Sequence, residues 1–325
     1  MQKWKRSKRF IKEDIVITIT LNPAIDVILY VDELYKGKLN RVDKYVRFAA
    51  GKGINVASFL SDLGFKNISV TGFLGEKNKY YFLDYFKEKS LNDNFIYYNG
   101  YTRENYKIVE DSTNVTTEVN TESIYREKLC LGAMQSMIEE FAPNFNYFVF
   151  SGSVPPTFNS DVYYKLGKIA VSKNKKVIID TSGIALKEAL RIPPFAIKPN
   201  YNEYCELLNK SSLTIKEIVE SLKYIHNKGV EYVLLTMGEK GALISTRDAK
   251  IFVKGVPDKI NSTTCAGDAF LSGFLYGIIN NCSLEEIAKL STASSLSLLS
   301  SFNRQLENIL SLERYYKNIE VEHIS

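Results

Sequence analysis

The sequence holds few of the residues that most often bind metals or act as catalytic nucleophiles. Its 325 residues include only two histidines, His226 in KYIHNKG and His323 in the tail. The four cysteines are widely scattered and lack the spacing of a metal site: Cys130, Cys205, Cys265 and Cys282. The sequence therefore argues against a zinc site built from His and Cys and against histidine-dependent nucleophilic catalysis.

Long apolar stretches are also lacking. No segment approaches the ~18 apolar residues of a membrane-spanning helix, and no apolar segment follows the basic N-terminus as in a secretory signal. We therefore expect a cytoplasmic protein with reduced thiols and without a membrane partner. Hydrophobic residues still make up 45% of the chain, which is enough for a sizeable core.

Positive charge is concentrated at one end of the chain. The formal net charge is +5, and the first twelve residues, MQKWKRSKRFIK, contain six Lys and Arg and no acidic residue. We expect residues 1–13 to form a basic, disordered leader; the alternative is an arm that binds nucleic acid. Because the rest of the chain is nearly neutral, no nucleic-acid partner is predicted.

Beyond the leader, strand and helix patterns alternate. Short β-branched runs are typical of buried strands at 15–21, 68–75, 147–152 and 176–183. The spacing of apolar residues predicts helices at 51–65, 80–91, 123–141, 161–173, 203–209 and 214–228, and a mostly helical chain after residue 268. This order predicts an α/β fold with helices on both faces of a mostly parallel sheet, in one domain over residues 14–320.

Two segments depart from this alternation. Residues 95–120 are rich in Tyr, Thr and Val and are interrupted by polar turns, which is typical of antiparallel hairpins. Residues 230–246, VEYVLLTMGEKGALIST, read as two strands around a glycine turn.

The unusual residues of the chain stand in loops after the predicted strands, where parallel α/β sheets bind their ligands. In TTCAGD, the backbone N–H groups of Cys265, Ala266 and Gly267 precede a helix and can form an anion site together with its dipole. The next residue, Asp268, can accept the proton of an attacking hydroxyl. The alternative is a carboxylate that only caps the helix.

Two loops nearer the N-terminus carry polar residues suited to a sugar. AAGKGINVA lacks the Walker sequence, and its plainer interpretation is a tight turn before a helix. Lys52 in this loop supplies a cation, and Asn55 can both donate to and accept from hydroxyls. Asp26, in NPAID, can hold further hydroxyls or simply close a turn.

Two loops in the second half fit a nucleotide and its metal. In KPNYNE, Asn200 and Glu203 are spaced to hold a hydrated Mg²⁺ through its waters; the alternative is a helix capping box. TMGEKGA fits a glycine turn close to a nucleotide, with a plain hairpin turn as the alternative.

Taken in order, these motifs resemble the PfkB (ribokinase-like) carbohydrate kinases, in their 1-phosphofructokinase and tagatose-6-phosphate kinase branch. TITLNPAID, AAGKGINVA, SGSVPP, DTSG, KPNYNE, TMGEKGA and TTCAGDAFLSGF match that family over roughly residues 14–315. The resemblance implies an ATP- and Mg²⁺-dependent kinase that converts fructose 1-phosphate to fructose 1,6-bisphosphate. The alternatives are a tagatose-6-phosphate or fructose-6-phosphate kinase, and a non-catalytic regulator that binds a sugar phosphate.

The resemblance also implies roles for single residues. Asp268 is expected as the general base, and the 265–267 backbone as the anion hole. Arg103 is expected on the substrate's existing phosphate, and Lys38 is expected to reach it from a partner subunit. The other residues expected at the sugar phosphate are Asp26, Gly51, Lys52, Asn55 and Ser153. ATP and water-held Mg²⁺ are expected at Lys198, Asn200, Glu203, Thr236, Gly238 and Gly241.

The resemblance further implies a small β lid, built from about 27–47 and 95–120, through which a homodimer forms. Cys265 departs from the family, which prefers Gly or another very small residue there. If the backbone at Cys265 has a positive φ, a cysteine is strained by about 1 kcal/mol or more. The tail STASSLSLLSSFNRQLEN also departs from the usual alanine and glycine clusters, which bears on the shape of the adenine pocket.

Overall fold

The structure is a computed structural model, and it describes residues 16–42, 44–113, 115–122, 130–261, 264–301, 305–306, 309 and 312–324. The predicted leader at 1–13 lies outside these residues, and so does the stretch 123–129 of the helix predicted at 123–141. The described part of that helix is α4 (Leu131–Phe141).

Within the described residues, the main sheet has eleven strands. Ten of them follow the order β15-β14-β13-β12-β11-β10-β9-β1-β4-β5, and β6 also pairs with β4. Pairing is parallel from β5 through β12 and antiparallel from β12 to β15. The strands are β1 (Val16–Thr20), β4 (Ile68–Gly75), β5 (Asn92–Asp93), β6 (Ile96–Tyr98), β9 (Tyr147–Ser151), β10 (Lys176–Asp180), β11 (Ala196–Ile197), β12 (Tyr232–Thr236), β13 (Ala242–Ser245), β14 (Lys250–Lys254) and β15 (Glu320–Ile324).

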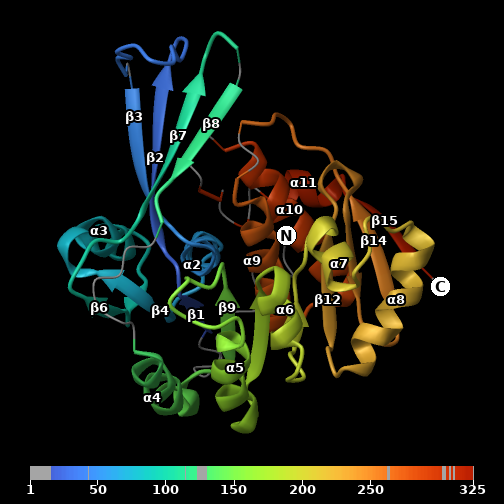
Figure 1. Cartoon of the computed structure of the whole chain (residues 1–325). Helices are drawn as coiled ribbons and strands as arrows, with labels where there is room; N and C mark the ends of the chain where they lie inside the picture. The colour runs from blue at the N-terminus through green and yellow to red at the C-terminus, as the bar shows by residue number, and fades with distance from the viewer. Residues whose placement is uncertain are drawn as a thin grey trace.

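Helices cover both faces of this sheet (Figure 1). One core packs under α2 (Lys52–Asp62), α3 (Tyr80–Glu88), α9 (Ala266–Ile279), α10 (Leu284–Leu299) and α11 (Glu313–Lys317). The other packs under α4, α5 (Val162–Ser172), α6 (Gly183–Ala189), α7 (Tyr201–Leu207) and α8 (Ile215–Asn227). Every residue of β1, VITIT, is buried, because a central strand has helices on both sides. The predicted fold class is therefore confirmed.

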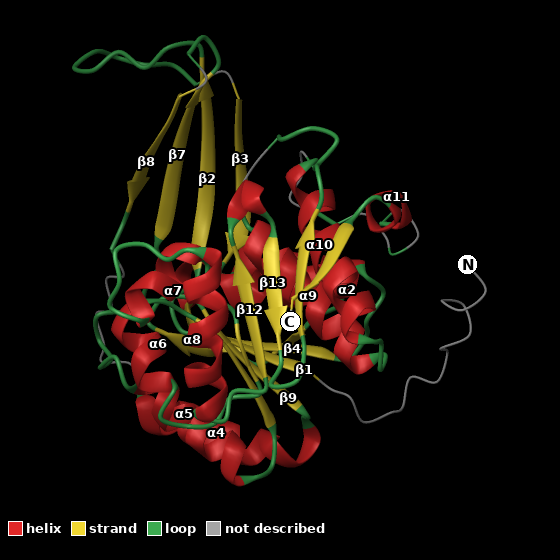
Figure 2. Ribbon diagram, turned by 90° about the vertical axis from the view of Figure 1, so that its right-hand side faces the viewer, coloured by secondary structure: helices red, strands yellow, loops and turns green. Residues whose placement is uncertain are grey.

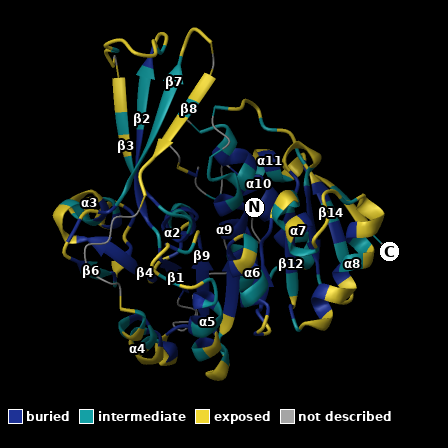
Figure 3. Ribbon diagram, in the orientation of Figure 1, coloured by how far each residue is buried: buried dark blue, intermediate teal, exposed yellow. Residues whose placement is uncertain are grey.

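Four further strands make a separate small sheet, in the order β3-β2-β7-β8. They are β2 (Ala24–Val31), β3 (Lys44–Ala50), β7 (Glu104–Glu110) and β8 (Val115–Asn120). The small sheet extends away from the helical layers (Figure 2), and β8 and the outer part of β3 are mostly exposed (Figure 3).

The interpretation of 95–120 as antiparallel hairpins holds only for β7 and β8, which do pair antiparallel. β6 instead joins the main sheet parallel to β4, and β7 pairs parallel to β2. Residue composition predicts that these segments form strands, but it does not predict which strands they pair with, because the paired strands lie far away in the sequence. Several elements had no specific prediction, among them β5, α6, β14 and β15. No helix among the described residues combines the length and the apolar character needed to cross a membrane.

The glycines of AAGKGIN let α2 lie close to β1. Gly51 has φ +144°, and a Cβ there would lie 2.7 Å from the Thr20 side chain. A Cβ on Gly53 would lie 2.4 Å from Thr20 Oγ1. These positions therefore require glycine, and the close approach fixes the next residues of α2 beside the carboxyl end of β1.

Candidate active site

A cleft of about 540 Å³ lies at the carboxyl ends of the central strands, between the base of the small sheet and the start of α9. Fourteen of the predicted site residues line it, although they come from loops spread over 240 residues of chain. They are Asp26, Gly51, Lys52, Asn55, Arg103, Ser153, Lys198, Asn200, Glu203, Thr236, Cys265, Ala266, Gly267 and Asp268.

The remaining three predicted residues lie elsewhere. Lys38 is exposed in the turn between β2 and β3, at the outer end of the small sheet, opposite the end that carries the cleft residues Asp26 and Gly51. Gly238 and Gly241 line a neighbouring pocket, where the short 3₁₀ turn Gly238–Lys240 connects β12 to β13. TMGEKGA is therefore a strand connection, as its plainer interpretation proposed, and it also borders a pocket.

Asp268 stands in the first turn of α9 and is only 5% exposed. Its Oδ2 accepts a hydrogen bond of 2.7 Å from Asn55 Nδ2. Burial, and then the negative charge of Asp180, raise the pKa of Asp268 to about 6, although Lys52 and Asn55 act in the opposite direction. A carboxylate with this pKa is charged near neutral pH and is a stronger base than an exposed aspartate.

Cys265 precedes α9 in the left-handed conformation, with φ +68° and ψ 4°. The following residues, Ala266 and Gly267, line the cleft. The first N–H groups of a helix have no partner within the helix. A Cβ on Gly267 would lie 3.2 Å from Lys198 Nζ, so this ammonium stands directly beside the helix N-terminus. The amides, the helix dipole and the lysine together favour an anion at this point.

Asp180, at the end of β10, is the main residue of the site that was not predicted. Its fully buried carboxylate contacts Lys198 Nζ at 3.1 Å and Lys52 Nζ at 3.3 Å, and accepts a hydrogen bond from Ser151 Oγ. Burial alone would raise the pKa of Asp180, but the two lysines outweigh it and the pKa lies below its usual value. Asp180 also raises the pKa of Lys52, which keeps this ammonium charged at the cleft. The DTSG motif was the available signal.

The other end of the cleft is a network of amides around Asp26 and Arg103. Asn105 donates to Asp26 Oδ1 at 2.9 Å, while Arg103 Nη1 contacts Asn105 Oδ1 and Arg103 Nε contacts Asn22 Oδ1 at 3.0 Å. Asn22 in turn donates to Ser153 Oγ. This network orients a guanidinium at the cleft wall, which suits a phosphate or carboxylate. Asn22 and Asn105 were not predicted, although Asn22 begins the NPAID motif and Asn105 stands two residues after Arg103.

Asn200 and Glu203 form the capping box that was the alternative interpretation of KPNYNE. Asn200 Oδ1 accepts from the Glu203 N–H at 2.9 Å, and Glu203 Oε2 accepts from the Asn200 N–H at 2.8 Å. Both residues also line the cleft, so capping fixes their side chains at its edge. No cluster of three or more His, Cys, Asp or Glu suited to a metal occurs among the described residues.

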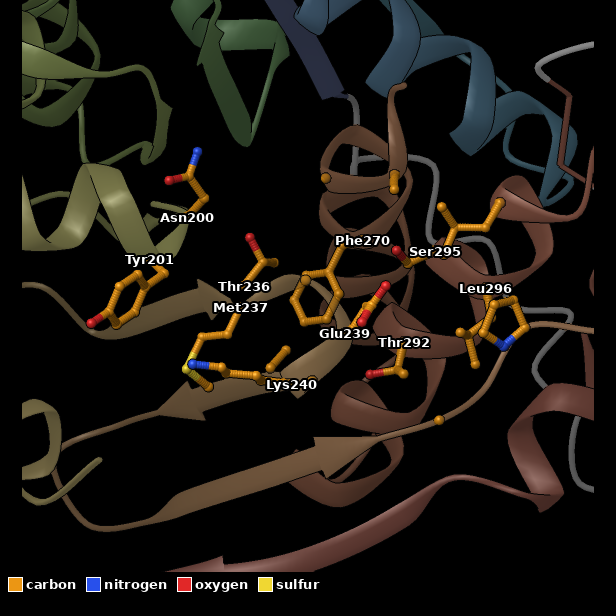
Figure 4. Close-up of a pocket in the computed structure, with 18 of the residues that line it drawn as sticks. Asn200, Tyr201, Thr236, Met237, Glu239, Lys240, Phe270, Thr292, Ser295 and Leu296 are labelled. Carbon is orange, nitrogen blue, oxygen red and sulfur yellow. The ribbon is translucent and has the colours of Figure 1, made fainter. Parts of the chain in front are cut away.

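A second pocket of about 560 Å³ adjoins the cleft, and the two share Asn200, Thr236, Ala266 and Gly267. Its walls are mostly apolar, and Figure 4 shows Met237, Phe270 and Leu296 around it with the hydroxyls of Thr292 and Ser295. A flat apolar group fits this pocket, while the polar cleft fits a charged, hydroxyl-rich one. The start of α9 lies where the two meet.

Comparison with known proteins identifies the family. The profile described as "pfkB family carbohydrate kinase" matches residues 13–306. The chain belongs to the pfkB family of carbohydrate kinases.

Relatives of this PfkB kinase carry the name of the branch that its motifs resemble. It is 33% identical over 282 residues to a 1-phosphofructokinase of Vibrio cholerae, covering 86% of this chain and 88% of the relative. It is 33% identical over 287 residues to a 1-phosphofructokinase of Bacillus subtilis, covering 86% and 90%. The solved phosphofructokinase-2 of Escherichia coli in complex with potassium aligns with a TM-score of 0.85 at 22% identity, covering 94% of this chain and 98% of that one, which supports the fold.

PfkB kinases use ATP as co-substrate, and this kinase has two adjoining pockets, one polar and one mostly apolar. The family resemblance inferred from seven motifs is thus confirmed. The individual roles assigned to the cleft residues stay predictions, because their positions fit these roles without testing them.

Proposed function

We propose that this kinase transfers the γ-phosphoryl group of ATP to the 6-hydroxyl of fructose 1-phosphate, giving fructose 1,6-bisphosphate. One observation carries the proposal: the buried Asp268 carboxylate lies beside the amide turn at the start of α9, where the polar cleft meets the apolar pocket. Relatives named 1-phosphofructokinase at 33% identity support the choice of sugar phosphate.

In the proposed reaction the sugar phosphate occupies the cleft, with Asp26 and Asn55 at its hydroxyls and Arg103 on its existing phosphate. Asp268 accepts the proton of the attacking hydroxyl as its oxygen bonds to the γ-phosphorus of ATP, while the bond between that phosphorus and the bridging oxygen breaks and ADP leaves. The amides of 265–267, with Lys198 and Lys52, stabilise the charge on the phosphoryl oxygens. The base and ribose of ATP occupy the second pocket, bordered by Thr236, Gly238 and Gly241.

The residues at the edge of the cleft fit Mg²⁺ held through water. Asn200 and Glu203 present amide and carboxylate oxygens there, and Mg²⁺ keeps several waters when few protein ligands are available. The ion would neutralise charge on the ATP phosphates.

The small sheet is proposed as a lid and as the contact of a homodimer. The small sheet and its connecting turn expose apolar side chains, including Leu39 (78% exposed), Tyr45 (62%) and Val119 (53%). In such a dimer Lys38 would approach the phosphate of the partner's substrate. We also propose a cytoplasmic location, where the cysteine thiols stay reduced.

The test is a coupled assay of ADP release with fructose 1-phosphate, fructose 6-phosphate, tagatose 6-phosphate and fructose. We expect the highest kcat/KM for fructose 1-phosphate. A higher value for another member of the panel would reassign the substrate. No turnover with any of them, combined with tight binding of one by calorimetry, would support the non-catalytic regulator instead.

A further inference from the structure

Lys107 is a charged residue of the small sheet that the proposed reaction does not use. It lies in β7, two residues after Asn105, so both side chains point to the same face of the sheet. The strand register places Asn105 opposite Asp26, which lines the cleft. Lys107 therefore faces the cleft rather than the outer surface, and its side chain is only 14% exposed.

Two contacts hold the Lys107 ammonium. One is with Glu118 Oε1 at 3.3 Å, directly across the β7–β8 ladder. The other leaves the small sheet: Lys107 Nζ donates to Thr264 Oγ1 at 3.3 Å, although 157 residues separate the two in sequence. Thr264 lines the cleft and immediately precedes Cys265, at which the chain turns into α9.

This contact joins the small sheet to the turn that presents the amides. Cys265 has a positive φ that a side chain disfavours, so neighbouring contacts must hold the turn in place. Asn55 contacts Cys265 Sγ at 3.3 Å from the α2 side. Lys107 contacts Thr264 from the opposite, small-sheet side, so the turn is held between the two.

We infer that Lys107 is a positioning residue for phosphoryl transfer: through Thr264 it holds the 264–267 turn in the arrangement that receives the phosphoryl group. Because Lys107 belongs to the small sheet, this contact couples the position of that sheet to the arrangement of the turn. This inference rests on the proposed function of the same site.

The kinetic test compares Lys107→Met, Lys107→Arg, Thr264→Val and the double variant Lys107→Met/Thr264→Val. We expect Lys107→Met and Thr264→Val each to lower kcat about tenfold, with less than a threefold change in KM for either substrate. The double variant should be no worse than the single ones, because both remove one bond. Lys107→Arg should recover most of kcat. A change confined to the KM of the sugar phosphate, or multiplying effects in the double variant, would overturn the inference.

Glu118→Gln is the matched control. It removes the charge pair within the small sheet but leaves the Lys107–Thr264 contact, so we expect kcat within about twofold of the unchanged protein. A loss equal to that of Lys107→Met would mean that Lys107 acts only inside its own sheet, which contradicts the inference.

A second readout needs no turnover. Cys265 is partly exposed, and so is Cys282, at the far end of α9. Mass spectrometry of iodoacetamide labelling should show Cys265 reacting several-fold faster in Lys107→Met, with Cys282 unchanged. An unchanged Cys265 rate would refute the ordering role, whatever substrate the panel identifies. Failure of the proposed function instead appears as inactivity of the unchanged protein on the whole panel.

Discussion

Asn55 Nδ2 lies 2.7 Å from Asp268 Oδ2, joining two glycine-containing loops that are 213 residues apart in sequence. This hydrogen bond holds the buried carboxylate from the α2 side. It lowers the pKa of Asp268, whereas burial raises this pKa.

Asp268→Asn should lower kcat by a factor of about 10²–10⁴, the usual contribution of a general base. Asparagine has nearly the same shape but does not accept the proton. Binding of the sugar phosphate, measured by calorimetry, should change little. Near-normal turnover in this variant would remove Asp268 from the role of base.

The same substitution should increase stability at high pH. The pKa of Asp268 is about 6 in the folded protein and 3.8 as an ordinary value. A raised folded pKa contributes stability that is fully present below pH 3.8 and is lost as the pH rises through about 6. Above pH 7 the buried charge opposes folding. At pH 8 the free energy of unfolding of Asp268→Asn, measured by denaturant titration, should therefore exceed that of the unchanged protein by on the order of 1–3 kcal/mol. A smaller difference at pH 5 is the internal control.

Asn55→Ala should move the acid limb of the pH profile to higher pH. In the unchanged protein, kcat/KM should fall below about pH 6, because the base must be deprotonated. The Asn55 amide stabilises the charged carboxylate, so its loss raises the pKa of Asp268 further. The quantity to measure is the pH at the midpoint of the acid limb, because the loss of sugar contacts also changes the plateau value of kcat/KM. A limb that stays in place would contradict this electrostatic role.

Cys265→Gly should be more stable than Cys265→Ala by about 1 kcal/mol. Both variants remove the thiol, but only glycine adopts φ +68° without steric cost. Urea unfolding of the two variants compares them directly. Equal stabilities would show that the turn carries no strain. Inactivation by iodoacetamide, if it occurs at this thiol, should disappear in both.

Arg103→Ala should mainly raise the KM for a phosphorylated sugar, by at least tenfold, with less effect on the KM for ATP. The guanidinium is held at the cleft wall by Asn22 and Asn105 and makes no contact with the second pocket. Arg103→Lys is the matched variant, which keeps the charge but not the bidentate fork. A selective loss of ATP binding would reverse the placement of the two substrates.

The sequence by itself determined the α/β class, the family and most of the cleft. Buried β-branched runs between helical segments leave few other architectures, and loops at strand ends are where such sheets bind ligands. Gly51, Asn55 and Asp268 could be predicted because glycine and lone polar residues are conspicuous in otherwise apolar surroundings.

Only the tertiary structure decided which charges face one another. The pairing of Asp180 with Lys52 and Lys198, the positive φ of Cys265, and the contact between Lys107 and Thr264 each join segments distant in sequence or depend on a local backbone angle. The partners of β6 and β7 were missed for the same reason. Hydrophobic patterning fixes which face of an element is buried, whereas contacts between loops depend on how the whole sheet closes.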